Sequence, residues 1–342
     1  MDFTGSQDIS KLKEWISGAA RITVLSHTHP DGDALGSSAG MGLFLQETLG
    51  KDVVCMVPDF PADNLRFILP EGLPFLSYDT APGKCQERIA ASDLLILLDG
   101  NNLSRTESLE RFLNASKARK VLIDHHVGPD KEHFQLVFST TEISSASELL
   151  YWILKALGGD TLPKGCLQAL LTGMTTDTNN FANSVFPGTF QMASEIISAG
   201  VDRDAIIQQL YNNYRENRVR LFGYMQAQGL KILPGGAAYM ILSKEILSRF
   251  DIREGESEGL VNVPLSIGQV RLSLLLKEDN GHFRVSIRSK KGTSARLLAQ
   301  EYFHGGGHEN ASGGKLYFPA DVATPKEAAA CVESILMKYL PR

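Results

Sequence analysis

The chain has 342 residues, 43% of them hydrophobic and 21% charged, which excludes a fibrous or largely disordered protein. Its formal net charge of −5 at pH 7 argues against a protein that neutralises the many phosphates of long duplex nucleic acid. Four scattered cysteines form no C-x-x-C pair, so we expect neither a structural zinc site nor a disulfide framework. The polar N-terminus and the lack of an 18-residue apolar run predict a cytoplasmic protein without a membrane segment.

Short apolar segments alternate with amphipathic ones in the first half of the chain, as in a parallel sheet covered by helices. The expected strands are 21–27, 52–59, 93–99, 120–126 and 134–140, and the expected helices are 34–50 and 146–158. Polar residues end three of these strands: His27, Asp99, and the run Asp124, His125 and His126. In open α/β sheets ligands bind outside the carboxyl ends of the strands, so we expect these side chains to gather at one edge.

The second half of the chain has a different pattern. The segment 186–229 is helical and polar, and we expect it to connect two domains. Beyond it we expect strands at 237–244, 269–279, 282–290 and 315–319, with helices at 294–302 and 325–340. We therefore predict an α/β protein with an N-terminal parallel-sheet domain (1–185), a helical connecting segment (186–229) and a smaller mixed-sheet α/β domain (230–342), with a cleft between the domains.

The strongest local motif is HTHPDGD, which directly follows the first strand. His27, Asp31 and Asp33 lie within seven residues, on a loop that Pro30 and Gly32 bend sharply. A divalent ion such as manganese accepts this mixture of carboxylate oxygen and imidazole nitrogen. In a simpler interpretation, Asp33 only caps the following helix and His27 is an ordinary residue at a strand end.

Further acidic residues strengthen the metal interpretation. We group Asp99, Asp124 and Asp177 as acidic strand ends that project toward the same edge of the sheet. Carboxylates packed together repel one another and are poorly solvated, so cations that neutralise them are the best explanation. The number of available ligands exceeds what one ion needs and matches a two-metal centre.

A locally basic stretch marks the distal domain. No acidic residue lies within 284–296, although the chain is acidic as a whole. Arginine can bind phosphate through two parallel hydrogen bonds, and the N–H groups of glycines 305–307 can approach an anion because no side chain blocks them. His308 closes that segment. The alternatives are a solvated strand edge that discourages edge-to-edge pairing and a glycine triplet that only forms a turn.

Together these motifs resemble the DHH phosphoesterase superfamily, in the branch with a C-terminal DHH-associated domain. The resemblance covers nearly the whole chain and rests on the order and spacing of its motifs. The matching residues are His27, Asp31 and Asp33; Asp99; Asp124, His125 and His126; Asp177 in TTDTNNF; Arg284, Ser286 and Arg288 in RVSIRSK; and Gly305, Gly306, Gly307 and His308.

The resemblance implies a role for each of these residues. His27 and Asp31 would hold one manganese ion, and Asp33, His125 and Asp177 would hold a second, with Asp99 bridging both. His126 would face the substrate phosphate and Asp124 would orient a neighbouring imidazole as catalytic residues. The substrate would be bound by Arg284, Ser286, Arg288, Gly305, Gly306, Gly307 and His308.

The branch resembles bacterial oligoribonucleases of the nanoRNase type. We therefore expect hydrolysis of short oligoribonucleotides to mononucleotides, of 3′-phosphoadenosine 5′-phosphate (pAp) to AMP, or of both. We expect neither long duplex nucleic acid nor a membrane as a partner, and the oligomeric state to test is a homodimer. The alternatives are a cyclic di-AMP or linear dinucleotide phosphodiesterase, a single-strand DNA exonuclease of the RecJ type, and a non-catalytic nucleotide-binding regulator.

One motif departs from the family pattern. Relatives frequently have glycine soon after the fourth-motif aspartate, whereas this chain has Thr178, Asn179 and Asn180. Asparagine tolerates left-handed backbone geometry, so we expect the turn to form here as well.

Overall fold

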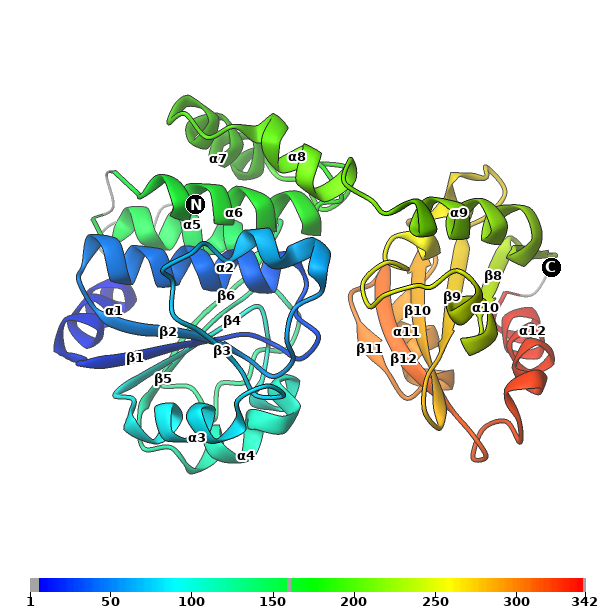
Figure 1. The fold of residues 1–342 in the computed structure, drawn as a ribbon, viewed down its shortest axis with the longest axis horizontal. Helices are drawn as coiled ribbons and strands as arrows, with labels where there is room; N and C mark the ends of the chain where they lie inside the picture. Colours follow the sequence, from blue (N-terminus) through cyan, green and yellow to red (C-terminus); the bar gives the residue numbers. More distant parts are fainter. Residues whose placement is uncertain (1–5, 159–160, 341–342) are drawn as a thin grey trace. The chain divides into compact units, whose positions relative to one another are not determined.

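The computed structural model describes residues 6–158 and 161–340, which divide into two compact units, Met1–Asn213 and Tyr214–Arg342 (Figure 1). Each unit has its own sheet and its own hydrophobic core. The division falls inside the helical segment 186–229.

The first unit is built on a parallel sheet in the order β3-β2-β1-β4-β5-β6. Every neighbouring pair of strands is parallel, as the alternation of apolar and amphipathic segments predicts. Strand β3 was not predicted, because three half-buried residues are too short for a pattern. The strands are β1 (Arg21–Leu25), β2 (Asp52–Val57), β3 (Phe75–Ser77), β4 (Leu94–Leu98), β5 (Arg119–Asp124) and β6 (Leu136–Ser139).

Strand β1 sits where the strand order reverses. The chain runs outward from β1 to β2 and β3, and it then returns to place β4 on the other side of β1. The loops that leave two such strands diverge, and the crevice at their carboxyl ends is where ligands bind in open α/β sheets. These are the loops that follow Leu25 and Leu98.

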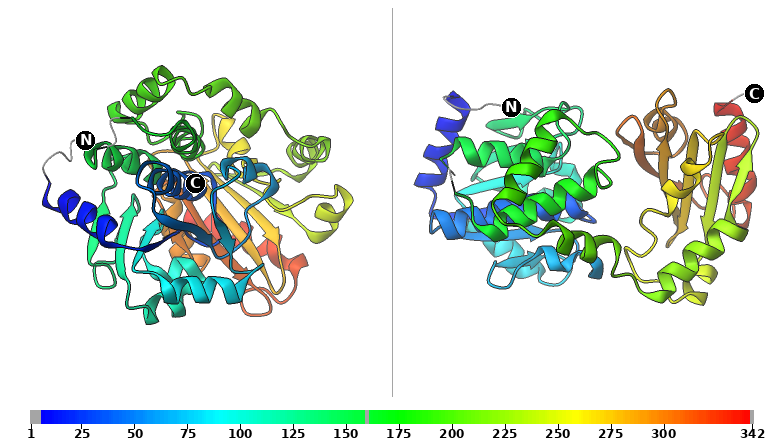
Figure 2. Two further views of the ribbon diagram at one scale, coloured as in Figure 1. Left: turned by 60° about the vertical axis from the view of Figure 1, so that its left-hand side comes forward. Right: turned by 90° about the horizontal axis from the view of Figure 1, so that it is seen from above.

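Helices cover both faces of this sheet. Helices α2, α5 and α6 pack on one face, whereas α3 and α4 pack on the other (Figures 1 and 2). Alternate strand residues supply the two cores: Val24 packs in the first and Leu25 in the second. The helices are α1 (Gln7–Gly18), α2 (Gly32–Leu43), α3 (Pro82–Ala91), α4 (Glu110–Ala115), α5 (Ala146–Ala156), α6 (Lys164–Asp177), α7 (Pro187–Ser198) and α8 (Arg203–Tyr211).

A glycine face brings α2 and α6 unusually close. Gly32, Gly36 and Gly40 lie four residues apart on α2, and a Cβ at Gly36 would lie 2.6 Å from the carbonyl oxygen of Ala169. Gly32 meets α6 at Thr176, Gly36 meets it between Gly173 and Ala169, and Gly40 meets it at Leu170, so the helices run antiparallel. The carboxyl end of α6 therefore lies beside the amino end of α2. Helix α6 was not predicted, because most of its residues are buried and it lacks a polar face.

The second unit contains a mixed sheet in the order β11-β12-β10-β9-β8-β7, in which only the β8–β9 pair is parallel. Helices α11 and α12 cover one face, and α9 covers the other (Figure 2). The elements are α9 (Glu216–Tyr224), β7 (Lys231–Leu233), β8 (Ala237–Leu242), α10 (Lys244–Arg249), β9 (Leu272–Glu278), β10 (His282–Ser289), α11 (Ala295–Tyr302), β11 (Gly306–Gly307), β12 (Ala311–Tyr317) and α12 (Ala328–Tyr339).

Among the described helices, none combines the length and the apolar character needed to cross a membrane.

Candidate metal centre

Asp99 occupies the middle of the predicted cluster. It directly follows β4, its side chain is 3% exposed, and its backbone adopts a left-handed conformation with φ of 56°. Its Oδ2 lies 3.4 Å from Nε2 of His27, and its Oδ1 lies 3.3 Å from Nε2 of His125. Each carboxylate oxygen therefore faces a different imidazole, on the two sides of one buried group.

His27 and Asp31 form the first group beside Asp99. Nδ1 of His27 lies 2.7 Å from the carbonyl oxygen of Thr28, to which it donates, so in the neutral ring Nε2 is the nitrogen whose lone pair a metal can use. Nε2 lies 3.9 Å from Oδ1 of Asp31. Asp31 is also the N-cap of α2 and accepts hydrogen bonds from the N–H groups of Asp33 and Ala34. The simpler interpretation assigned this cap to Asp33 and was wrong, because Asp33 serves another helix.

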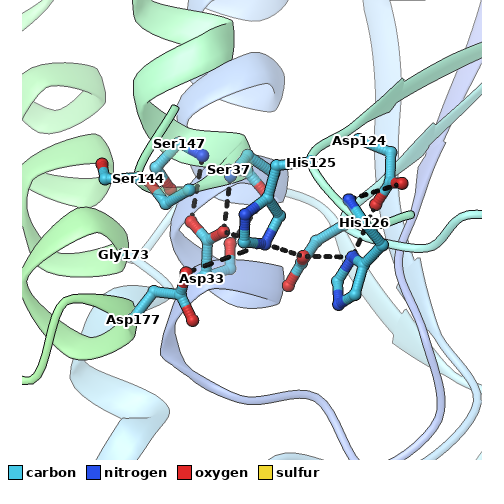
Figure 3. A network of polar contacts seen from close by, with 12 residues as sticks. Asp33, Ser37, Asp124, His125, His126, Ser144, Ser147, Gly173 and Asp177 are labelled. Atoms are coloured by element: carbon cyan, nitrogen blue, oxygen red, sulfur yellow. Dashed lines mark hydrogen bonds and ion pairs between the residues drawn. The ribbon is translucent and has the colours of Figure 1, made fainter. Parts of the chain in front are cut away.

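Asp33 lies at the amino end of α5. Its two oxygens accept hydrogen bonds from the N–H groups of Ala146 at 2.7 Å and of Ser147 at 2.9 Å. A Cβ at Gly173 would lie 3.0 Å from Oδ1 of Asp33 and 2.1 Å from Oγ of Ser147, so only glycine fits there. The carboxylate is therefore fixed by backbone on one side and faces His125 on the other, 3.9 Å from Nε2 (Figure 3).

Asp177 completes the second group, but it does not come from a strand. It is the last residue of α6, and the close packing of α6 on α2 brings it to Asp33 (Figure 3). Our grouping of Asp177 with the strand ends was wrong for this reason. Its Oδ2 lies 3.7 Å from Nε2 of His125. The left-handed turn expected after it is confirmed, with φ of 48° at Asn179 and 56° at Asn180.

Asp124 and His126 form a buried pair beside these groups. Oδ1 of Asp124 lies 2.8 Å from Nδ1 of His126, and Oδ2 accepts the backbone N–H of the same histidine at 2.9 Å. Asp124 is fully buried at the end of β5. The carboxylate therefore fixes both the backbone and the ring of His126, which matches the orienting role implied for Asp124.

The electrostatics of the cluster show strong coupling between carboxylates and imidazoles. Burial alone would lower the pKa of His27 and His125, but contacts with Asp99 and the other carboxylates raise these pKa values to about 9 and about 10. Burial would raise the pKa of Asp99, yet the two imidazoles hold it well below its ordinary value. Burial and the neighbouring carboxylates raise the pKa of Asp33 well above its ordinary value, and burial raises that of Asp177 to about 6.

The donor set suits a divalent metal ion. The ligand atoms of His27, Asp31 and Asp99 lie within 4.8 Å of one another, and so do those of Asp33, His125 and Asp177. Oδ1 of Asp99 is buried and accepts no hydrogen bond of good geometry from the described residues, although His125 lies beside it. A buried oxygen of this kind is suited to binding a cation. Carboxylate oxygen and imidazole nitrogen are ligands for ions such as Mn²⁺ or Mg²⁺, and no cysteine belongs to either group.

The predicted substrate-binding residues of the distal sheet share one strand face. Arg284, Ser286 and Arg288 alternate along β10 with buried residues of the core, so all three lie on the side opposite that core. The guanidinium of Arg284 donates to Glu254 at 2.8 and 3.1 Å, and that of Arg288 donates to backbone carbonyls, including that of Ile287 at 2.9 Å. Arg284 is thus already paired with an anion within its own unit.

The glycine run forms a short strand. Gly306 and Gly307 make up β11, which pairs with β12 in register with Gly313 and Ser312. The simple-turn alternative is therefore wrong. A Cβ at Gly305 would lie 2.0 Å from the carbonyl oxygen of Gly313, so glycine is required for this approach. Across β12, Gly313 pairs with Ser286, which places the glycine run and the β10 face in one part of the sheet. The half-buried His308 follows, with its N–H bonded to the carbonyl of Ala311 at 2.8 Å.

Sequence reasoning missed Asp59, which holds the metal-binding loop. Asp59 follows β2, and its Oδ2 accepts hydrogen bonds from the Thr28 hydroxyl and from the N–H of His29 at 2.8 Å. His29 has a φ of 50°, which turns the loop between His27 and Asp31. The rule that found the other strand-end carboxylates also applies to Asp59, because it ends an expected strand.

Comparison with known proteins agrees with this geometry. Residues 21–174 match the DHH family, N-terminal domain, and residues 237–330 match the DHHA1 domain. The chain is 30% identical to the probable bifunctional oligoribonuclease and PAP phosphatase NrnA of Streptococcus mutans, covering 87% of this chain and 91% of that protein. It is 29% identical to the bifunctional oligoribonuclease and PAP phosphatase NrnA of Bacillus subtilis, covering 86% and 90%.

A solved structure is also similar. The crystal structure of an exopolyphosphatase-related protein from Bacteroides fragilis matches with a TM-score of 0.92 and 36% identity, covering 100% of this chain and 98% of that one. These matches place the chain in a class of phosphoesterases. The chain belongs to the DHH family within that class, with a DHHA1 domain.

Proposed function

We propose that this phosphoesterase is manganese-dependent and that it hydrolyses short oligoribonucleotides to mononucleotides, pAp to AMP, or both. We further propose that 1–185 is the catalytic domain, that 230–342 binds substrate, and that 186–229 connects them. The names of the two NrnA relatives support the substrate class, since both cover most of the chain.

The observation that carries the proposal is the placement of Asp99. One of its oxygens faces each imidazole, and each imidazole belongs to a separate group of three ligands. A carboxylate in this position can bridge two cations. Two bound divalent ions would act as Lewis acids on the phosphate and would lower the pKa of a shared water, so that hydroxide forms near neutral pH.

The other residues have roles that follow from their contacts. His27 and Asp31 hold the first position, and Asp33, His125 and Asp177 hold the second. Asp124 fixes His126 through Nδ1, and we assign the other ring nitrogen, Nε2, to an oxygen of the scissile phosphate. Because Nδ1 donates to Asp124, Nε2 can donate to the phosphate only when the ring carries both protons, and such a hydrogen bond would stabilise the negative charge that grows on the phosphoryl group during an in-line displacement.

We assign substrate binding in the distal unit to the face of β10 and the adjoining glycine strand. Arg288, Ser286 and Gly306 share this part of the sheet, and arginine and backbone N–H groups are both suited to phosphate oxygens. Arg284 would join them only by exchanging Glu254 for a phosphate. His308 continues the same segment.

A turnover profile of the purified full chain with Mn²⁺ tests the function. The panel contains pAp, labelled RNAs of two to five nucleotides, cyclic di-AMP, single-stranded DNA and inorganic polyphosphate. We expect release of mononucleotides from the short RNAs, of inorganic phosphate from pAp, or both, with little activity on the other compounds. Asp99→Asn is the matched inactive control, because it preserves the size of the side chain and removes the bridging charge.

Three results would contradict the proposal. Cleavage of cyclic di-AMP in preference to the linear RNAs would favour the signalling phosphodiesterase. Processive release from long single-stranded DNA would favour a RecJ-type exonuclease, and turnover of polyphosphate alone would favour the activity suggested by the name of the Bacteroides protein. Tight binding of nucleotide without turnover would identify a regulator.

A further inference from the structure

We propose that Arg105 is a substrate-binding residue of the catalytic unit, and that its guanidinium contacts the phosphate bound at the metal centre. The inference rests on the proposed function and names a residue that none of the motifs of the sequence includes. Arg105 lies in the short 3-10 helix Leu103–Leu109 that follows β4, six residues beyond Asp99.

Arg105 is adjacent to the loop that carries His27. Its carbonyl oxygen accepts the N–H of Thr28 at 2.8 Å. A Cβ at Gly100 would lie 3.7 Å from the Cβ of Arg105 and 3.8 Å from that of His27, so the two side chains start no more than about 7.5 Å apart. A side chain as long as arginine spans such a distance. The backbone of Arg105 is also held in place, because its N–H donates to the side-chain oxygen of Asn102.

The guanidinium is an uncompensated cation at this site. Arg105 is exposed, and its side chain makes no hydrogen bond or ion pair with any part of the chain that the structure describes. Its charge is nevertheless felt in the cluster, where burial and then Arg105 act to lower the pKa of His27 against the opposing carboxylates. A long cationic side chain beside several carboxylates that pairs with none of them suits a group that meets an anion arriving from solution.

The chemistry of the site explains why that anion is a phosphate. The carboxylates of the cluster belong to the two groups of proposed metal ligands, and none of them pairs with Arg105 among the described residues. A phosphate held by those ions would present further oxygens to the surroundings, and a planar guanidinium can bind two of them at once. Arginine also stabilises the charge that grows on the transferring group.

The test compares three full-length variants with the wild type in saturating Mn²⁺. Arg105→Gln removes the charge, Arg105→Lys restores it without the planar fork, and Arg111→Gln is the control. Arg111 is an exposed arginine of α4 that stacks on Phe112, with its guanidinium carbon 4.5 Å from the ring centre. The measurements are Mn²⁺ affinity, the melting temperature, the Kd of inorganic phosphate by calorimetry, and hydrolysis of pAp and dinucleotides.

We expect Arg105→Gln to weaken phosphate binding by about 10- to 100-fold and to lower kcat/KM by at least as much. Mn²⁺ affinity and melting temperature should match the wild type, Arg105→Lys should regain part of the phosphate affinity, and Arg111→Gln should change nothing. Unchanged phosphate affinity in Arg105→Gln overturns the inference, even if the wild type hydrolyses RNA. If the wild type binds phosphate but cleaves no compound of the panel, and Arg105→Gln loses that phosphate binding, the inference stands and the proposed function is refuted.

Discussion

The approach of α2 to α6 sets the distance between Asp33 and Asp177, so a single methyl group at this contact should disturb the metal centre. We choose Gly36→Ala. The new Cβ would lie 2.6 Å from the carbonyl oxygen of Ala169, whereas ordinary contacts begin at 3.4 Å. The helices must therefore separate by roughly 0.8 Å, because the obstructing atoms belong to backbone and cannot rotate away.

This separation has two measurable effects. Overpacking of this kind costs about 1–3 kcal/mol, which lowers the melting temperature of a unit of this size by about 2–12 °C. Metal ligation tolerates displacements of only about 0.2 Å, so the Mn²⁺ affinity of the position proposed for Asp33, His125 and Asp177 should fall about 10- to 100-fold. The position proposed for His27 and Asp31 takes no ligand from α6 and should change less.

The assay is thermal unfolding and Mn²⁺ calorimetry of Gly36→Ala against Gly83→Ala. Gly83 is also helical, in α3, but a Cβ there would meet nothing within 4 Å. Alanine at that position should therefore leave stability unchanged or raise it by up to about 1 kcal/mol. If Gly36→Ala melts and binds Mn²⁺ like Gly83→Ala, the close approach of the helices does not set the geometry of the site.

Three further outcomes follow from the same contacts. Asp59→Asn should loosen the loop between His27 and Asp31 and thereby weaken Mn²⁺ binding about tenfold, with little change in melting temperature. If the variant binds Mn²⁺ as tightly as the wild type, Asp59 is not needed to hold this loop. The pKa values of His27 and His125 are raised to about 9 and about 10, so both rings carry protons at pH 7 that a metal must displace. Mn²⁺ affinity should therefore rise with pH up to about 10, and calorimetry in different buffers should detect proton release. A flat profile would contradict the coupling. Partial burial would raise the pKa of Glu195, but hydrogen bonds from Lys155, Tyr151 and Gln191 lower it to about 2, so the contribution of this carboxylate to stability is complete above about pH 4.5 and is lost as the pH falls through 2. Glu195→Gln should therefore lower the free energy of unfolding at pH 7 by about 1–2 kcal/mol and should flatten the dependence of that free energy on acid pH. If urea titrations find the same loss of stability at pH 3 as at pH 7, Glu195 does not act in this way.

Much of the fold was accessible from the sequence, because buried parallel strands have a strong signature. Runs such as 94–98 are wholly apolar and are followed directly by a polar residue, here Asp99, so both the strand and its polar end are visible. The class of fold and the strand-end ligands His27, Asp99 and His125 follow from that pattern. Short elements such as β3 and β11 were missed because two or three residues carry no periodicity.

What remained inaccessible depends on tertiary contacts. Asp177 belongs to a helix without a polar face, and only the packing of glycines against α6 explains how it reaches Asp33. Likewise, the sequence suggests Asp33 as a cap of the helix that follows it, and it does not reveal that Asp33 instead accepts N–H groups at the amino end of the distant α5. Arg284 appeared as a free cation in a stretch without acidic residues, whereas its partner Glu254 comes from a segment 30 positions away.

The most direct test of the account is the anomalous diffraction of Mn²⁺ in crystals of the wild type and of Asp99→Asn. The account predicts two peaks per chain, about 3.5–4 Å apart, with one oxygen of Asp99 directed at each, and the loss of at least one peak in a variant that keeps its fold. A single ion in the wild type, or two ions too distant for one carboxylate to reach both, would contradict it.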